Sequence, residues 1–414
     1  MKYNLLRNLP FYKFLNTALR IFPLGMKFLF IAILSKYVSI EDYGDYLLIA
    51  TTITISIFVL GLDYYNFSIR NILKEKIDVT TKIYNAFVLY FLIYSIFILF
   101  GNIFFENISF IKKNGVVLII LLCITEHLNQ EIYRLQIAFK KILTANVIFF
   151  LRVFGWTTYL VIGLLFFKIL ISINDILTLW FTSNLLAILI NVLVIWKEIF
   201  RIKKIPKIDL NYLKSGLTVS ALFFIGTISL KSIEYINRYI VDIMLGSEKT
   251  GIFSFYSNFI MVIPVYINAI VISFELPAII ERAQEKDLMK YFKKFQKSLL
   301  IQIIIMSIII LIAIKPILLW QGVELYSNHL YILFFLLVGV GLMNYSLSYH
   351  FFLYVKEQDK KILALIINAG AFNLVFTISL TYLLGLLGTS IAFTLTGIYM
   401  FYLRYINAKK LNYG

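Results

Sequence analysis

The chain has one cysteine, Cys123, among 414 residues, which excludes an internal disulfide. Cys123 falls within an apolar run and is best explained as a small packed residue. The three histidines, His127, His329 and His350, are too scattered for a metal site with the usual ligand spacing. A glycine-rich phosphate loop ending in Lys-Ser/Thr is also missing, which argues against ATP hydrolysis. We therefore expect no metal and no cofactor.

Charge is scarce as well. Charged residues make up 15% of the chain, against about a quarter in ordinary soluble proteins. Hydrophobic residues make up 61%, the mean hydropathy is +0.87, and there are only six prolines. Apolar runs of about 20 residues predict an all-α integral membrane protein with many spans. The first run follows Lys2, Arg7 and Lys13 and lacks a small-residue cleavage site, so we expect a retained membrane helix.

Twelve spans can be placed from hydropathy. The first six are expected at Phe11–Ser35, Tyr43–Leu62, Ile83–Phe105, Val116–Phe139, Ala145–Phe167 and Ile176–Trp196. The second six are expected at Ser215–Ile240, Gly251–Leu276, Ser298–Ile314, Ser327–Tyr354, Ile362–Leu384 and Gly385–Arg404. A nearly uncharged turn around Leu384–Thr389 joins the last two spans.

Loops long enough for a soluble catalytic domain are missing, and the charges in the short loops are strongly biased. If both termini are cytoplasmic, 29 of the 39 Lys and Arg residues lie in cytoplasmic segments and 7 lie on the opposite side. This bias predicts cytoplasmic termini by the positive-inside rule. The basic residues behind the net charge of +17 then orient the protein in the bilayer and interact with anionic lipid. We therefore expect no nucleic-acid partner.

The chain contains an internal repeat. Glu41-x-x-Gly44-x-Tyr46 recurs as Glu248-x-x-Gly251-x-Phe253, at an offset of half the chain. An even number of spans per half makes the repeat parallel, which is a transporter architecture. We expect a six-helix lobe over 1–205, a second over 206–414, a central cavity between them, and a monomer because one chain holds both lobes.

Charged residues inside the first and seventh spans are the first candidate site. Arg20 and Lys27 share one helix face, and so do Lys231, Glu234 and Arg238. Charges within the bilayer are costly unless they face protein or water. Four cations and one carboxylate predict a cationic cavity for an anionic, phosphate-bearing cargo. The competing interpretation is snorkelling for Arg20, structural pairing or snorkelling for Lys27, and structural ion pairing for the others.

The fourth span carries the second candidate group. Glu126 lies near mid-span beside His127, and such a pair can bind a proton or a sodium ion. Glu234 is the third ion-coupling candidate. Interhelical hydrogen bonding competes with this interpretation. Glu131 and Arg134 are expected to form a structural pair, and structural roles are also favoured for Asp63, Arg152, Asn344 and His350.

Several stretches resemble Wzx-type polysaccharide flippases. The loop before the second span and the end of that span carry the family's S-x-E-x-x-G-x-Y and G-L patterns, at Ser39, Glu41, Gly44, Tyr46, Gly61 and Leu62. The second half is similar at Gly246, Gly251, Phe253, Pro277, Asn373, Gly385 and Gly388. One position departs from the pattern, because the family often has an acidic residue where this chain has Asn237 before Arg238.

The resemblance implies the superfamily of multidrug, oligosaccharidyl-lipid and polysaccharide exporters, with two six-helix lobes. It implies a multi-pass protein of the bacterial inner membrane and a cargo of undecaprenyl-diphosphate-linked oligosaccharide, an O-antigen or capsule repeat unit of lipopolysaccharide or related glycans. A polysaccharide polymerase and a chain-length regulator are the partners it suggests besides the bilayer. Headgroup contacts carry over only to Arg20, Lys27 and Lys231.

Two other functions remain open from the sequence. A drug exporter of the same superfamily predicts carboxylates and few cations in the cavity, unlike the first and seventh spans. A membrane polysaccharide polymerase or glycosyltransferase usually needs a large outer loop, and the outer loops here are short. We therefore expect a transporter and not an enzyme.

Overall fold

The computed structural model describes residues 10–74, 79–199, 206–281 and 288–411. Most of these residues are helical, and no strand occurs among them. Eleven of the helices are long and apolar enough to cross a membrane. The predicted all-α membrane fold is confirmed.

The described helices form two compact units. The first comprises Met1–Val38 and Asp45–Thr227, and the second comprises Ser39–Gly44 and Ile228–Gly414. The chain therefore passes between units three times: just before α3 (Ile40–Gly61), inside α3 after Gly44, and inside α10 (Leu210–Leu245) after Thr227. The expected lobe boundary at 205–206 lies at the edge of the described residues and stays a prediction.

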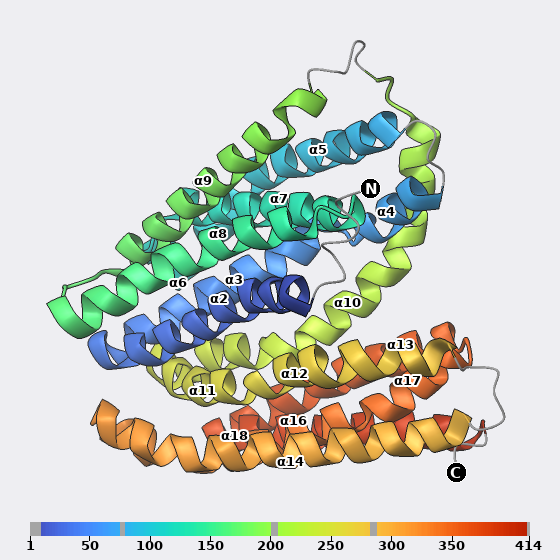
Figure 1. Ribbon diagram of the computed structural model, residues 1–414. Helices are drawn as coiled ribbons and strands as arrows, with labels where there is room; N and C mark the ends of the chain where they lie inside the picture. Colours follow the sequence, from blue (N-terminus) through green and yellow to red (C-terminus); the bar gives the residue numbers. More distant parts are fainter. Residues whose placement is uncertain (1–9, 75–78, 200–205, 282–287, 412–414) are drawn as a thin grey trace. The chain divides into compact units, whose positions relative to one another are not determined.

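The first unit is a bundle of long helices. Its elements besides parts of α3 and α10 are α2 (Pro10–Tyr37), α4 (Tyr64–Lys74), α5 (Val79–Phe105), α6 (Ser109–Lys113), α7 (Val116–Ala138), α8 (Ile142–Ile162), a π-helical turn (Gly163–Phe167) and α9 (Ile173–Ile199). Helix α8 packs against α2 and α9, and α7 packs against α9 and α5 (Figure 1). These contacts bring the fourth predicted span beside the fifth and sixth.

Small residues set the closest approach within this unit. A Cβ added to Gly216 on α10 would lie 2.8 Å from a ring carbon of Phe67. Tyr64 and Leu213 belong to the same buried apolar cluster. The beginning of α10 therefore belongs to the first unit through direct aromatic packing.

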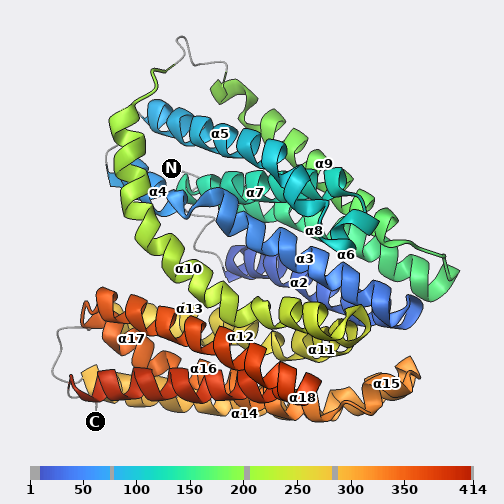
Figure 2. The same cartoon turned by 180° about the vertical axis from the view of Figure 1, so that it is seen from behind.

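The second unit is also helical. Its elements besides parts of α3 and α10 are α11 (Ser247–Ile260), α12 (Val262–Tyr266), a π-helical turn (Ile267–Ile272), α13 (Ser273–Glu281), α14 (Leu288–Gln321), α15 (Glu324–Ser327), α16 (Tyr331–Tyr345), α17 (Leu347–Val355) and α18 (Asp359–Lys409). Helix α16 packs along α18 and also contacts α14 and α11 (Figure 2). The backbones of α16 and α18 meet at two glycines, because a Cβ on Gly397 would lie 3.0 Å from the Cα of Gly339.

The last two predicted spans form one element with a break. Within α18, Gly385 has φ 61° and ψ −137°, which is not a helical conformation. Glycine adopts such a conformation without the steric cost that a Cβ imposes. The turn expected around Leu384–Thr389 therefore lies where the sequence placed it.

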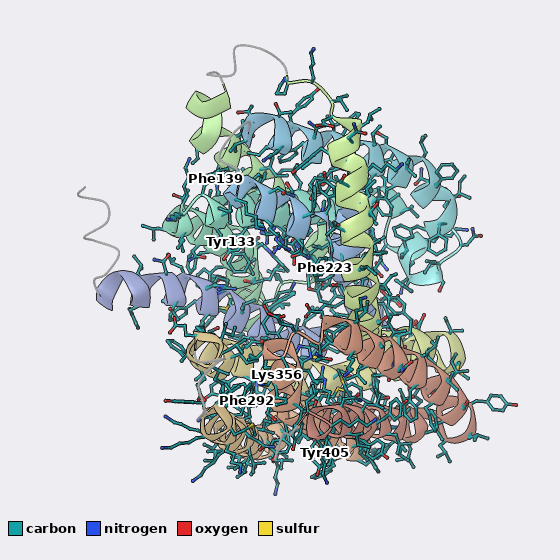
Figure 3. All side chains as sticks on the ribbon, turned by 90° about the vertical axis from the view of Figure 1, so that its right-hand side faces the viewer. Tyr133, Phe139, Phe223, Phe292, Lys356 and Tyr405 are labelled. Carbon is teal, nitrogen blue, oxygen red and sulfur yellow. The ribbon has the colours of Figure 1, made fainter. Side chains whose placement is uncertain are left out.

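Aromatic contacts close one end of this unit. Phe292 on α14 packs edge-to-face on Phe352 of α17 with ring centroids 5.3 Å apart, and the Lys356 ammonium lies 5.9 Å from the same ring. Figure 3 labels Phe292 and Lys356 on these neighbouring segments, with Tyr405 of α18 nearby. Tyr405 packs on Tyr349 at 5.5 Å, so the end of α18 is held against α17.

Candidate functional site

Lys27 lies on α2, four residues after the internal Pro23. Its side chain is partly buried, and its ammonium sits 4.7 Å from the centroid of the Trp180 ring on α9. Trp180 stacks on Trp156 of α8 at 5.7 Å, and Phe30 of α2 packs against Trp156 at 5.4 Å. Two tryptophans therefore form an aromatic wall that favours a cation at this place.

Glu126 on α7 is completely engaged by neighbouring helices. Its Oε2 accepts from the Arg152 guanidinium of α8 at 3.1 Å, and its Oε1 accepts from the Trp180 indole at 2.5 Å. Glu126 and Arg152 are buried at 7% and 6% exposure. Burial of a charge is tolerated when it is paired and hydrogen bonded, so Glu126 ties three helices of the first unit together.

The Lys27 ammonium interacts electrostatically with both Glu126 and Arg152. The carboxylate neutralises one of the two cations, which leaves one positive charge in this group. We call Lys27, Glu126, Arg152 and Trp180 the Lys27 cluster. An excess cation over an aromatic ring is suited to bind an anion, because the ring contributes attraction without neutralising the charge.

Arg20 does not join the Lys27 cluster. It lies on the same helix, but its side chain is exposed and makes no ion pair with any described residue. The exposed position agrees with the snorkelling alternative. Its role in binding stays a prediction.

His127 follows Glu126 in the sequence yet belongs to a different group, because consecutive residues of a helix point about 100° apart. Its Nδ1 lies 2.6 Å from the Tyr94 hydroxyl of α5. Its Nε2 lies 3.8 Å from Oε1 of Glu131. Glu131 pairs with Arg134, as expected from the sequence. The two ion-coupling candidates of the fourth span are thus separated into two environments.

In the second unit, Lys231 and Glu234 form the predicted helical pair on α10. The Lys231 ammonium donates to Oε2 of Glu234 at 2.6 Å, and the side chains are 21% and 29% exposed. The ammonium also lies 5.6 Å from the Tyr235 ring. This pair is partly accessible, as a binding group must be.

Arg238 lies one turn further along α10 and is buried at 4% exposure. Its guanidinium donates to Oδ1 of Asn258 on α11 at 2.9 Å and lies 5.8 Å from the Tyr235 ring. Lys231, Glu234 and Arg238 together carry one excess positive charge, like the Lys27 cluster. Burial makes Arg238 less accessible than Lys231.

Asn237, where the resemblance leads one to expect an acidic residue, lies in a buried amide network. Its Oδ1 accepts from Asn373 at 3.2 Å and from Thr377 at 2.9 Å, both on α18. Asn373 accepts in turn from Thr396 at 3.1 Å. A neutral amide at this position therefore joins α10 to both segments of α18.

The structure thus brings Lys27 to Glu126 and Lys231 to Glu234, while Arg20 and His127 lie apart from these groups. Sequence reasoning assigned Arg152 a structural role and overlooked Trp180. Arg152 lies 26 residues from Glu126 and Trp180 lies 54 residues away. Only the helical packing brings them together, so no local pattern could have identified them.

The comparisons agree with this fold. Residues 14–281 match the family model described as polysaccharide biosynthesis protein. The match covers well over half of the chain, which therefore belongs to the polysaccharide biosynthesis protein family. No curated protein matches the chain.

Solved structures show the same architecture. A multidrug resistance MATE family transporter of the MOP superfamily, in an inward-facing conformation, matches with a TM-score of 0.71 at 14% identity, over 96% of this chain and 95% of the other. The lipid II flippase MurJ matches with a TM-score of 0.75 at 12% identity, over 96% and 87%. The Vibrio cholerae MATE transporter VcmN matches with a TM-score of 0.63 at 13% identity, over 96% and 94%.

The chain therefore has the same fold as this MOP-superfamily transporter and the lipid II flippase, as the resemblance implied. These neighbours are two transporters and one flippase.

Proposed function

We propose that the protein flips undecaprenyl-diphosphate-linked oligosaccharide from the cytoplasmic to the outer leaflet of the bacterial inner membrane by alternating access. The cargo would be an O-antigen or capsule repeat unit that a polymerase then consumes. Membership of the polysaccharide biosynthesis family supports a glycan cargo. The neighbouring lipid II flippase has the same fold.

The observation that carries the proposal is a partly buried lysine in each unit. Lys27 lies over Trp180 and Lys231 lies near Tyr235, and each belongs to a group with one excess positive charge. Ammonium groups bind phosphate oxygens as point charges. One cation from each unit would supply a point charge for each phosphate of a diphosphate.

Arg20 and Arg238 remain proposed secondary contacts. Among the ion-coupling candidates, both oxygens of Glu126 already accept hydrogen bonds, so an ion must compete with Arg152 and Trp180 there. The side chain of Glu234 is more accessible than that of Glu126, and the side chain of His127 has fewer hydrogen-bond partners than that of Glu126. The coupling role of all three is part of the proposal.

The test is leaflet-resolved accessibility of the lipid-linked oligosaccharide in cells depleted of the protein. Wild type should relieve the accumulation in the inner leaflet, and Lys27→Ala with Lys231→Ala should not. The matched control is Lys112→Ala with Lys315→Ala, which removes two exposed lysines. Normal outward exposure without any copy of the protein would overturn the flippase and favour drug export, whereas full rescue by the Lys27 and Lys231 variant would remove only the cationic site.

A further inference from the structure

Asp63 directly follows α3 and has an unusual environment. Leu62 and Asp63 have φ angles of 46° and 51°, in the left-handed region that side chains disfavour. Asp63 is only 2% exposed, and its Oδ2 accepts no hydrogen bond from any described residue. Such strain persists where the surroundings enforce it and is often found at functional sites. Here the strained turn holds one carboxylate oxygen in the interior without a donor.

A second carboxylate lies near Asp63. Glu131 of α7 is 4% exposed and interacts electrostatically with Asp63. Glu131 also pairs with Arg134 and accepts from the Tyr90 hydroxyl at 2.8 Å. Arg134 stacks on the Tyr65 ring at 3.6 Å, which fixes its guanidinium at this place. Arg134 can therefore neutralise one carboxylate of the two.

His127 completes the group. Its ring is fully buried, and its Nε2 makes no hydrogen bond with any described residue. Gly61, the last residue of α3, faces this nitrogen so closely that a Cβ would lie 2.8 Å from it. The end of α3 therefore contacts the imidazole through a glycine and then places Asp63 near Glu131.

The charges of this group do not balance. Two carboxylates and one guanidinium leave one negative charge when the imidazole is neutral. The titratable or charged groups that the structure places against these residues are Arg134 on α7, Tyr90 and Tyr94 on α5, and Tyr64 and Tyr65 on α4, with Tyr212 and Asp209 beyond Tyr64. Arg134 is the one cation among these contacts, and an unpaired buried charge is expensive.

A proton is the smallest change that restores neutrality. Within the described residues, no three His, Cys, Asp or Glu side chains converge closely enough to hold a metal ion. We propose that Asp63, His127, Glu131 and Arg134 form a proton-binding site of the first unit, in which the Asp63 carboxyl takes up the proton. We call this group the Asp63 cluster.

This proton-binding site extends the ion-coupling part of the proposed function. Its role in transport rests on that function, whereas proton binding itself does not. Release of the proton leaves two buried carboxylates beside one arginine, which favours movement of the strained end of α3. Because α3 continues into the second unit at Ser39–Gly44, such a movement acts on a helix that both units share. Protonation can in this way be coupled to a change of conformation.

The experiment is infrared difference spectroscopy of the purified full-length protein in detergent during a pH titration without cargo. A protonated carboxylic acid has a carbonyl stretch that a carboxylate lacks. We expect one such band from a buried acid, which decreases as the pH rises. It should disappear in Asp63→Asn and remain in Asp175→Asn, which changes an exposed aspartate on α9.

Wild-type protein with 13C-labelled aspartate provides the same test without substitution, so a poorly folding variant does not decide the outcome. The band should shift with labelled aspartate and stay in place with labelled glutamate. Absence of the band, a shift only with labelled glutamate, or loss of the band when sodium replaces potassium at constant pH would overturn the assignment. Because no cargo is present, failure here is distinct from failure of the flipping assay.

Discussion

Gly44 and Gly251 pack against each other's backbone within the second unit. A Cβ on Gly44 would lie 2.9 Å from the Gly251 nitrogen and closer still to the Ser247 carbonyl oxygen. A Cβ on Gly251 would lie 2.9 Å from Cγ2 of Ile40 and closer still to the Ile40 carbonyl oxygen. Ile40 and Ser247 are themselves equivalent in the sequence repeat, so the contact is symmetric and the two repeated motifs bind each other.

This contact predicts that Gly44→Ala and Gly251→Ala destabilise the protein by about 1–3 kcal/mol each, because backbone must move to admit the methyl group. The midpoint of thermal unfolding in detergent measures the effect. Gly155→Ala on α8 is the matched control, since a Cβ there meets open space. Equal midpoints for Gly44→Ala and Gly155→Ala would contradict the close approach.

The Glu126–Arg152 pair predicts strong coupling. Glu126→Ala leaves a buried guanidinium unpaired and should cost about 3–5 kcal/mol. Arg152→Ala should cost a similar amount, and the two substitutions together much less than their sum. A double-mutant cycle on thermal unfolding measures this, and additive losses would show that the pair is not formed.

The amide network of Asn237 predicts a loss of stability when the Asn237 side chain is truncated. Asn237→Ala removes the acceptor of Asn373 and Thr377 and should cost about 1–3 kcal/mol, because their donors remain buried without a partner. Asn107→Ala, at an exposed asparagine of the first unit, should change stability by less than about 0.5 kcal/mol. Thermal unfolding of both variants tests the difference.

The conformation of Gly385 at the break in α18 predicts that any other residue at this position would strain the backbone. Gly385→Ala should destabilise the second unit by about 1–3 kcal/mol, because its φ of 61° with ψ of −137° is nearly restricted to glycine. Limited proteolysis near the break should become faster. Unchanged proteolysis and thermal stability would show that α18 can continue through this point.

The expected orientation predicts a pattern of labelling. Cys123 is buried and is the only cysteine, so Cys123→Ala provides a background for single substitutions. Lys112→Cys should react with an impermeant maleimide added outside intact cells, and Lys74→Cys should react only after the membrane is opened. The reverse pattern would place the termini outside and invert the proposed direction of flipping.

The sequence by itself determined the class of fold and the outline of the spans. Apolar runs such as Val116–Phe139 are long enough to cross a bilayer, and the observed α7 ends within one residue of that range. The pair Glu131–Arg134 was also predictable, because residues three apart share a helix face. Lys27 and Lys231 could be identified as candidates because a charge inside an apolar run needs an explanation.

Only the tertiary structure decided which charges meet. Glu126 binds Arg152 and Trp180 from two other helices, and Asp63 lies near Glu131 because α3 ends against α7. The sequence repeat predicted that Gly44 and Gly251 occupy equivalent positions, but it did not predict that they are in contact. Sequence periodicity records the face of a single helix, whereas pairing between helices depends on their packing, and packing is set by the whole set of side chains at once.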